Sequence, residues 1–297
     1  MNDMEHEGVP SELSRRDLAR LLSSIERGDQ ITLPAIIQDA PWRILGVTGA
    51  PGVGKSCLVN AIASHWIRVH DRRIAILAVD PSSPRTGGAL LGDRIRMQAT
   101  DDPELSDRMY VRSVATRRTS GSVPMTVARM AEALLASGWD RVIIETVGSG
   151  QSDLRVACMA DLLLLVEGPH AGDGVQAEKA GRIEVADALV VNKADLPDSV
   201  RVRNELVESL LLGAEVAPEV LLVSARTGDG VDALCDHLES LRANHAARRI
   251  RAFQRLIGAW EERLTAHDDL DAVLDDLSEG RIDAVAAVAR IGGWGHG

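Results

Sequence analysis

Short, largely apolar runs recur along the middle of the chain, at residues 44–48, 74–79, 142–146, 162–166, 188–191 and 220–223. Such runs are typical of parallel strands that are covered on both faces. Between them, residues 57–69, 124–136, 200–212 and 231–242 have helical patterns. This alternation predicts an α/β fold: a doubly wound, mostly parallel sheet with ligands at the carboxyl ends of its strands.

Both ends of the chain have helical patterns and no strands. In residues 14–27, apolar positions such as Leu18, Leu22 and Ile25 recur at helical spacing. After about residue 241 the strands stop, and residues 246–264, 270–277 and 282–291 have helical patterns. We therefore expect three parts: an N-terminal helical extension (1–40), a central α/β domain (41–240) and a C-terminal helical extension (241–297). The apolar faces of the last helices need a cover, so we expect the C-terminal extension to serve dimerisation.

The composition narrows the classes of function. Acidic side chains outnumber basic ones, 44 to 33, which gives a net charge of −11 and argues against a general binder of nucleic acid or anionic membranes. Aromatic residues make up 2% of the chain, so the core must be aliphatic and no stacking platform for bases is expected. No apolar run is long enough for a membrane span, and the acidic N-terminus has no signal-peptide character. Three scattered cysteines suggest neither disulfides nor a thiolate metal site, so the expected location is cytoplasmic.

A phosphate-binding motif follows the first apolar run. Residues 49–56 fit the pattern G-x-x-x-x-G-K-[ST] at every fixed position and precede a helical stretch. Glycines allow backbone N–H groups to converge on phosphate oxygens, Lys55 adds charge near the outer phosphates, and the Ser56 hydroxyl can ligate Mg²⁺. The domain is thus predicted to be a P-loop NTPase. Its predicted phosphate contacts are Gly49, Ala50, Pro51, Gly52, Val53, Gly54, Lys55, Ser56 and Cys57.

A second motif, at the end of a later strand, indicates the base. Asn192, Lys193 and Asp195 form the N-K-x-D pattern of GTPases. The Asp195 carboxylate can accept two hydrogen bonds from guanine, whereas adenine offers no such pair of donors. Lys193 can lie across the base, and Asn192 can connect this loop to the phosphate loop. Ser224 and Ala225 follow the last strand and fit a second guanine-contacting loop, so GTP and GDP are the expected ligands.

Carboxylates at strand ends are candidates for a Mg²⁺ shell. Glu145 would hold a metal-bound water, and the Gly148 N–H would sense the γ-phosphate. Asp80 ends another strand, and Asp93 follows in a Gly-rich segment. The expected metal residues are Ser56, Asp80, Asp93 and Glu145, and the expected catalytic residues are Lys55, Glu145 and Asp80.

Three segments carry a resemblance to a known family. Residues 80–94, 145–153 and 192–195 resemble the MeaB/MMAA/ArgK family of P-loop GTPases, in the SIMIBI class. The resemblance implies a homodimeric chaperone that couples GTP hydrolysis to cofactor loading, protection and reactivation of an adenosylcobalamin-dependent acyl-CoA mutase, with an adenosyltransferase as a further partner. It also implies residues that switch with the nucleotide or couple to the partner: Arg85, Thr86, Gly87, Gly88, Asp93, Gln151, Asp173, Gln176 and Lys179.

The sequence departs from the family pattern at a few positions. In the loop at residues 172–181, Ala180 replaces a lysine that the family usually carries and Glu178 replaces an apolar residue. Ser149 and Arg85 stand where the family often has valine and an aromatic residue. No residue is evident that must orient the attacking water, so we expect slow intrinsic hydrolysis and a partner that completes or reorders the site.

Three other functions compete with this interpretation. A metallochaperone GTPase for nickel or zinc would need a thiolate or histidine-rich site, and the eight histidines are scattered. An ATP-dependent kinase is disfavoured by Asp195, which suits guanine. A scaffold with a degenerate nucleotide site is disfavoured by the intact Lys55 and Ser56.

Overall fold

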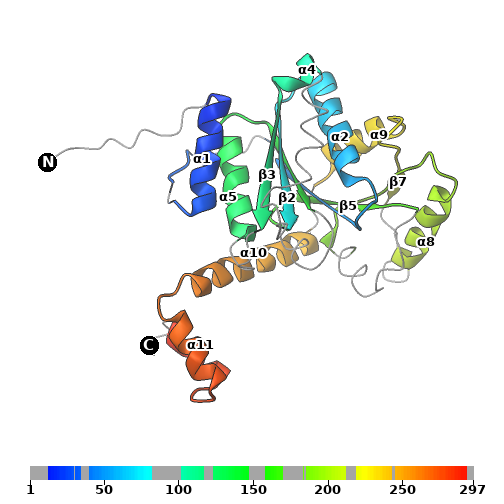
Figure 1. Cartoon of the computed structure of the whole chain (residues 1–297). Coiled ribbons are helices and arrows are strands. Elements are labelled where there is room, and N and C mark those ends of the chain that lie inside the picture. The colour runs from blue at the N-terminus through cyan, green and yellow to red at the C-terminus, as the bar shows by residue number, and fades with distance from the viewer. Residues whose placement is uncertain are drawn as a thin grey trace.

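A parallel sheet forms the centre of the molecule (Figure 1). The structure is a computed structural model that describes residues 13–29, 31–34, 40–81, 102–116, 123–146, 158–169, 183, 185–211, 219–242 and 245–292. Within these residues, seven strands lie in the order β3-β2-β4-β1-β5-β6-β7, and every neighbouring pair is parallel. They are β1 (Ile44–Thr48), β2 (Ile74–Pro81), β3 (Met109–Thr116), β4 (Arg141–Thr146), β5 (Leu162–Glu167), β6 (Ala188–Val191) and β7 (Val220–Leu222). The predicted α/β fold is confirmed.

Helices cover both faces of the sheet (Figure 1). Helices α2 (Lys55–His70) and α9 (Val231–Ser240) pack on one face, and α1 (Arg15–Arg27) and α5 (Val123–Ala136) pack on the other. The alternation is visible in β5, where Leu162 and Leu164 belong to the core under α2 while Leu165 faces the core that α8 (Ser199–Leu211) covers. Because both faces are covered, the strands are apolar at nearly every position.

The edge strand β3 was not expected from the sequence. Its run is broken by Arg112 and Ser113, and the apolar pattern therefore predicted no strand there. In the fold, the Arg112 guanidinium donates to the carbonyl of Ala19 and to the Glu26 carboxylate, 2.7 Å away, both on α1. A charged residue is tolerated on this strand because groups on α1 accept hydrogen bonds from two of its guanidinium nitrogens. The short helix α4 (Pro103–Ser106), just before β3, was also not predicted.

The N-terminal helix shares its core with the α/β domain. The Ser14 hydroxyl caps α1 by accepting from the Asp17 N–H, and Gly28 ends the helix in the left-handed conformation. Leu18 and Leu22 are fully buried against α5. The observed helix begins and ends within one residue of the expected range of 14–27.

The C-terminal extension consists of the three predicted helices, α10 (His245–Thr265), α11 (Leu270–Ser278) and α12 (Ala284–Gly292). The first half of α10 is fixed to the sheet by Arg251, which is 2% exposed and donates to Asp187 at 2.7 Å. The second half leads away from the sheet towards α11 (Figure 1). Helices α11 and α12 share a small core of their own around Val273.

Among the described residues, no helix combines the length and the apolar character that a membrane span requires.

Candidate nucleotide site

The loop after β1 depends on glycine backbones. Gly49, Gly52 and Gly54 have φ angles of 149°, 80° and 92°, which side chains with a Cβ rarely adopt. A Cβ on Gly49 would lie 2.0 Å from the carbonyl oxygen of Val166, on the neighbouring strand β5. Gly54 begins α2 with no side-chain cap, so the first N–H groups of that helix remain available to an anion.

Lys55 is buried beside this loop, with only 6% of its surface exposed. Its Nζ donates to the carbonyl oxygens of Gly49 and Ala50 at 2.8 and 2.9 Å. These bonds hold the ammonium group over the loop, where a triphosphate would lie. The expected role of Lys55, as the charge near the outer phosphates, stays a prediction.

Ser56 and Glu145, two of the expected metal residues, lie in contact. The Ser56 Oγ donates to Glu145 Oε1 at 2.6 Å, and Glu145 is fully buried at the end of β4. β4 lies directly beside β1, and this neighbourhood brings together two residues that are 89 positions apart. A hydroxyl and a carboxylate are the oxygen groups that Mg²⁺ prefers, so this pair fits one side of a metal shell.

Asn192 joins three loops, as expected from the motif. Its Nδ2 donates to the carbonyls of Val53 and Gly54 at 3.0 and 3.2 Å. Its Oδ1 accepts from the N–H of Ala225 at 3.0 Å. The phosphate loop and the two base-side loops are therefore held in one arrangement by a buried amide.

The Asp195 carboxylate, expected to meet the base, lies between Ser224 and Arg226. The Ser224 Oγ donates to Asp195 Oδ1 at 2.6 Å, and the exposed Arg226 lies 3.0 Å from Oδ2. The hydrogen bond from Ser224, with smaller contributions from Arg226 and Lys193, lowers the pKa of Asp195 below its ordinary value. The carboxylate is thus held ionised and acceptor-only, as guanine requires.

Two features of the base side were not expected from the sequence. Arg226 was not singled out, although its place one residue after Ser224-Ala225 was a signal that could have found it. Lys193 has a left-handed φ of 61° and its Nζ donates to the carbonyl of Gly52 at 2.7 Å. Its ammonium group is therefore tied to the phosphate loop, and the bond leaves its methylene stem available to a base.

Several predicted residues lie outside the described part of the chain. They are Arg85, Thr86, Gly87, Gly88, Asp93, Gly148, Gln151, Asp173, Gln176 and Lys179, and the departures Ser149, Glu178 and Ala180 lie there too. Asp80 belongs to β2, beside the end of β4, but its side chain is not described. Within the described residues there is no group of three or more His, Cys, Asp or Glu side chains arranged to hold a metal ion.

A phosphate loop and a guanine-type acceptor, joined by Asn192 on a parallel sheet, define the chain as a P-loop GTPase. The chain belongs to the family described as "Methylmalonyl Co-A mutase-associated GTPase MeaB", whose sequence model matches residues 29–274. This confirms the family that the sequence motifs resemble.

Individual relatives agree with the family. The chain is 38% identical over 224 residues to "Probable GTPase Rv1496" of Mycobacterium tuberculosis, covering 73% of this chain and 66% of that protein. It is 35% identical to "GTPase ArgK" of Escherichia coli over 238 residues, covering 76% of this chain and 70% of that protein. The solved structure titled "Crystal structure of LAO/AO transport system kinase" aligns with a TM-score of 0.56 at 24% identity, over 95% of this chain and 98% of the other, and supports the fold.

Proposed function

We propose that this protein is a GTP-hydrolysing chaperone that assists cofactor loading, protection and reactivation of an adenosylcobalamin-dependent acyl-CoA mutase. The family description names a methylmalonyl-CoA mutase-associated GTPase, and that name supports a mutase as the client. The observation that carries the guanine part of the proposal is the ionised Asp195, oriented by Ser224 at 2.6 Å. No described feature favours nickel or zinc delivery or a kinase reaction over this function.

The chain's own residues would bind and orient GTP with Mg²⁺. Ser56 and Glu145 would hold the metal, with Asp80 and Asp93 as further ligands, and Mg²⁺ would neutralise charge on the phosphates. Lys55 would add a second positive charge, and the N–H groups at the start of α2 would donate to phosphate oxygens. Asn192 would keep the base side aligned with the phosphate side.

Hydrolysis by the isolated protein is expected to be slow. Lys55 and the helix N-terminus stabilise charge, but positioning of the attacking water is a separate requirement. We assign that step to rearrangement of the switch and coupling residues named above when the client binds. Under this proposal the nucleotide site is mainly a sensor, and residues 80–94 and 172–181 relay its state.

A homodimer is part of the proposal. The C-terminal helices expose large apolar side chains: Phe253, Leu256, Trp260, Leu274, Leu277, Val285 and Val288. Such a concentration on one extension favours burial against a second copy. Analytical ultracentrifugation should give a dimer that Leu256→Glu weakens, while Val69→Glu, at an exposed position on α2, leaves it intact. A monomeric parent protein would contradict the dimer.

The proposal also includes the domain boundaries and the cellular location. We assign the nucleotide site to a GTPase domain over residues 41–240, with helical extensions over 1–40 and 241–297. Free thiols at Cys57, Cys158 and Cys235 fit the reducing cytoplasm.

Calorimetry tests the choice of nucleotide. GDP, a GTP analogue, ADP and an ATP analogue would each be titrated with Mg²⁺ into the parent protein and into Asp195→Asn. The parent should prefer guanine, and Asp195→Asn should lose that preference because an amide cannot accept both guanine N–H groups. An adenine preference in the parent would overturn the proposal.

Turnover measurements test the client. GTP hydrolysis would be followed with and without an acyl-CoA mutase encoded beside this gene, with an unrelated enzyme as control. The mutase should change the rate and the control should not. Equal rates would reject the coupling while leaving guanine binding untouched.

A further inference from the structure

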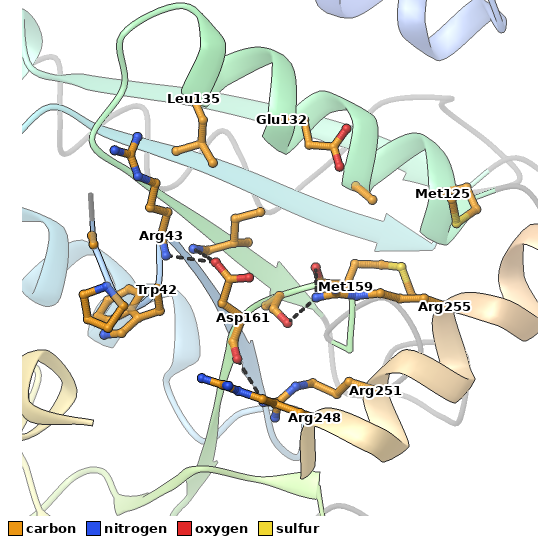
Figure 2. Close-up of a pocket in the computed structure, with 15 residues that line it drawn as sticks. Trp42, Arg43, Met125, Glu132, Leu135, Met159, Asp161, Arg248, Arg251 and Arg255 are labelled. Atoms are coloured by element: carbon orange, nitrogen blue, oxygen red, sulfur yellow. Dashed lines mark hydrogen bonds between the residues drawn. The ribbon is translucent and has the colours of Figure 1, made fainter. Parts of the chain in front are cut away.

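A pocket of about 580 Å³ lies between α5, α10 and the residues that lead into β1 and β5 (Figure 2). Its volume is within the range of small-molecule sites, and it lies where a helical extension meets the main domain, as such sites often do. Arg43 and Ile44 line it at the amino end of β1, whereas the phosphate loop follows the carboxyl end of that strand. Five residues of strand separate the two, about 16 Å, so this pocket is distinct from the nucleotide site.

Arginines dominate the polar lining of the pocket. Arg43, Arg248, Arg251 and Arg255 contribute to it, against the carboxylates of Glu132 and Asp161. The chain as a whole has a net charge of −11, so an excess of positive charge at one place is unusual for this protein. Guanidinium groups that converge on a cavity are the preferred donors to carboxylate and phosphate oxygens.

Two of these arginines have a structural role. Arg251 is buried and donates to Asp187, to the carbonyl of Val185 and to the carbonyl of Asp161. Arg255 donates through one nitrogen to the carbonyls of Met159 and Ala160. These bonds hold the side of α10 that carries Arg251 and Arg255 against the wall of the pocket.

Arg248 differs from its neighbours on α10. Within the part of the chain that the structure describes, it makes no hydrogen bond or ion pair, and it lies one turn before Arg251 on the same side of the helix (Figure 2). One oxygen of the Asp161 carboxylate, Oδ2, accepts from the backbone N–H groups of Arg43 and Ile44 at 2.9 and 3.0 Å. Arg248 is therefore an exposed charged donor that lines the pocket and has no acceptor assigned to it.

The opposite wall of the pocket is apolar. Met125 and Leu135 on α5 line it, and Met159, before β5, adds an apolar side chain beside Arg255 (Figure 2). Glu132 is the acidic exception on α5, and it would repel an anion that approached from that side. An apolar wall facing guanidinium groups suits a molecule with a short aliphatic body and one anionic end.

We propose that this pocket binds a small organic anion, with its carboxylate or phosphate group on Arg248 and its aliphatic part against Met125, Leu135 and Met159. Because α5 belongs to the GTPase domain and α10 begins the C-terminal extension, the bound anion would strengthen the connection between them. The inference does not depend on the identity of the client protein.

The test is calorimetry on the full chain saturated with GDP and Mg²⁺, so that the phosphate loop is filled. The probes are butyl phosphate, butyrate, inorganic phosphate and neutral butanol. One or both organic anions should bind at a single site, with inorganic phosphate weaker and butanol silent. Arg248→Gln should weaken binding about tenfold or more, since a hydrogen bond to a charged group is lost.

Two matched variants serve as controls. Arg249→Gln removes the next arginine of α10, which does not line the pocket, and should leave affinity unchanged. Glu132→Gln removes the repelling carboxylate and should tighten binding. The proposal is overturned if neither organic anion saturates below about 10 mM, or if Arg249→Gln costs as much as Arg248→Gln. Equal affinity for inorganic phosphate would overturn the role of the apolar wall.

Discussion

At its carboxyl end, β1 leads into a loop whose shape is set by glycine backbones, whereas its amino end meets a network of charged side chains. The loop needs Gly49, Gly52 and Gly54 at φ angles that other residues avoid. The network instead joins Arg251 to the Asp187 carboxylate and to the backbone carbonyls of Val185 and Asp161. One end of the strand is thus built for a ligand by local backbone geometry, and the other holds the C-terminal extension by long-range contacts.

The largest expected effect is at the amino end. Arg251→Ala would leave Asp187 buried and without its guanidinium partner, and should lower the free energy of unfolding by about 3–5 kcal/mol. Chemical denaturation measures this, with Arg249→Ala as a surface control that should change little. Joint replacement of Arg251 and Asp187 by leucine should recover part of the loss. If Arg251→Ala lowered the free energy of unfolding no more than Arg249→Ala, the ion pair would not contribute to stability.

The phosphate loop should be more sensitive at Gly54 than at Gly52. Both have positive φ, so either alanine variant carries backbone strain of about 1–2 kcal/mol. Only at Gly54 would a Cβ lie 2.6 Å from Asn192 Nδ2 and disturb the bonds that join the loops, whereas nothing lies within 4 Å of a Cβ at Gly52. Gly54→Ala should therefore lower both stability and GTP affinity more than Gly52→Ala. Equal effects would mean that Asn192 does not fix the loop.

Replacing Lys55 tests whether the sites at the two ends of β1 bind their ligands independently. Lys55→Ala removes a charged donor from the phosphate site and should weaken GTP binding about 10–100-fold. Butyl phosphate binding at the opposite pocket should be unchanged in the same variant, because the two sites lie at different ends of β1. Calorimetry with each ligand gives both values, and a parallel loss of both would show that the ends are coupled.

Arg226 should give the smallest effect. It is 80% exposed, so its ion pair with Asp195 is screened by solvent, and Arg226→Ala should change GDP affinity less than about threefold. Ser224→Ala should do more, because its hydrogen bond is the main cause of the lowered pKa of Asp195. A carboxyl group with a lowered pKa is fully charged at pH values above its ordinary pKa. It loses that charge only as the pH falls through the lowered pKa. Either variant should therefore move the titration of Asp195, followed by carboxyl NMR, to higher pH, and Ser224→Ala should move it further.

The sheet was largely predictable from the sequence, and the one strand that was missed, β3, shows why. Six strands are apolar runs, since burial on both faces leaves little room for polar residues. β3 was missed because Arg112 interrupts it, and only the packing of α1 against that edge explains how its charge is accommodated. The observed helix ends differ from the predicted ones by a few residues. Helix α2, for example, begins at Lys55, inside the phosphate motif.

The sequence by itself determined the nucleotide site, because phosphate and guanine recognition require particular residue types at fixed spacing along short loops. Glycines must allow positive φ, Lys55 must follow them, and Asp195 must follow a strand. Tertiary structure alone decided that Ser56 meets Glu145 across β1 and β4, that Arg226 faces Asp195, and that α10 carries Arg248 and Arg251 to the amino end of the sheet. These contacts join residues distant in sequence through charge and packing, for which no local pattern exists, so they emerge only when the chain is folded.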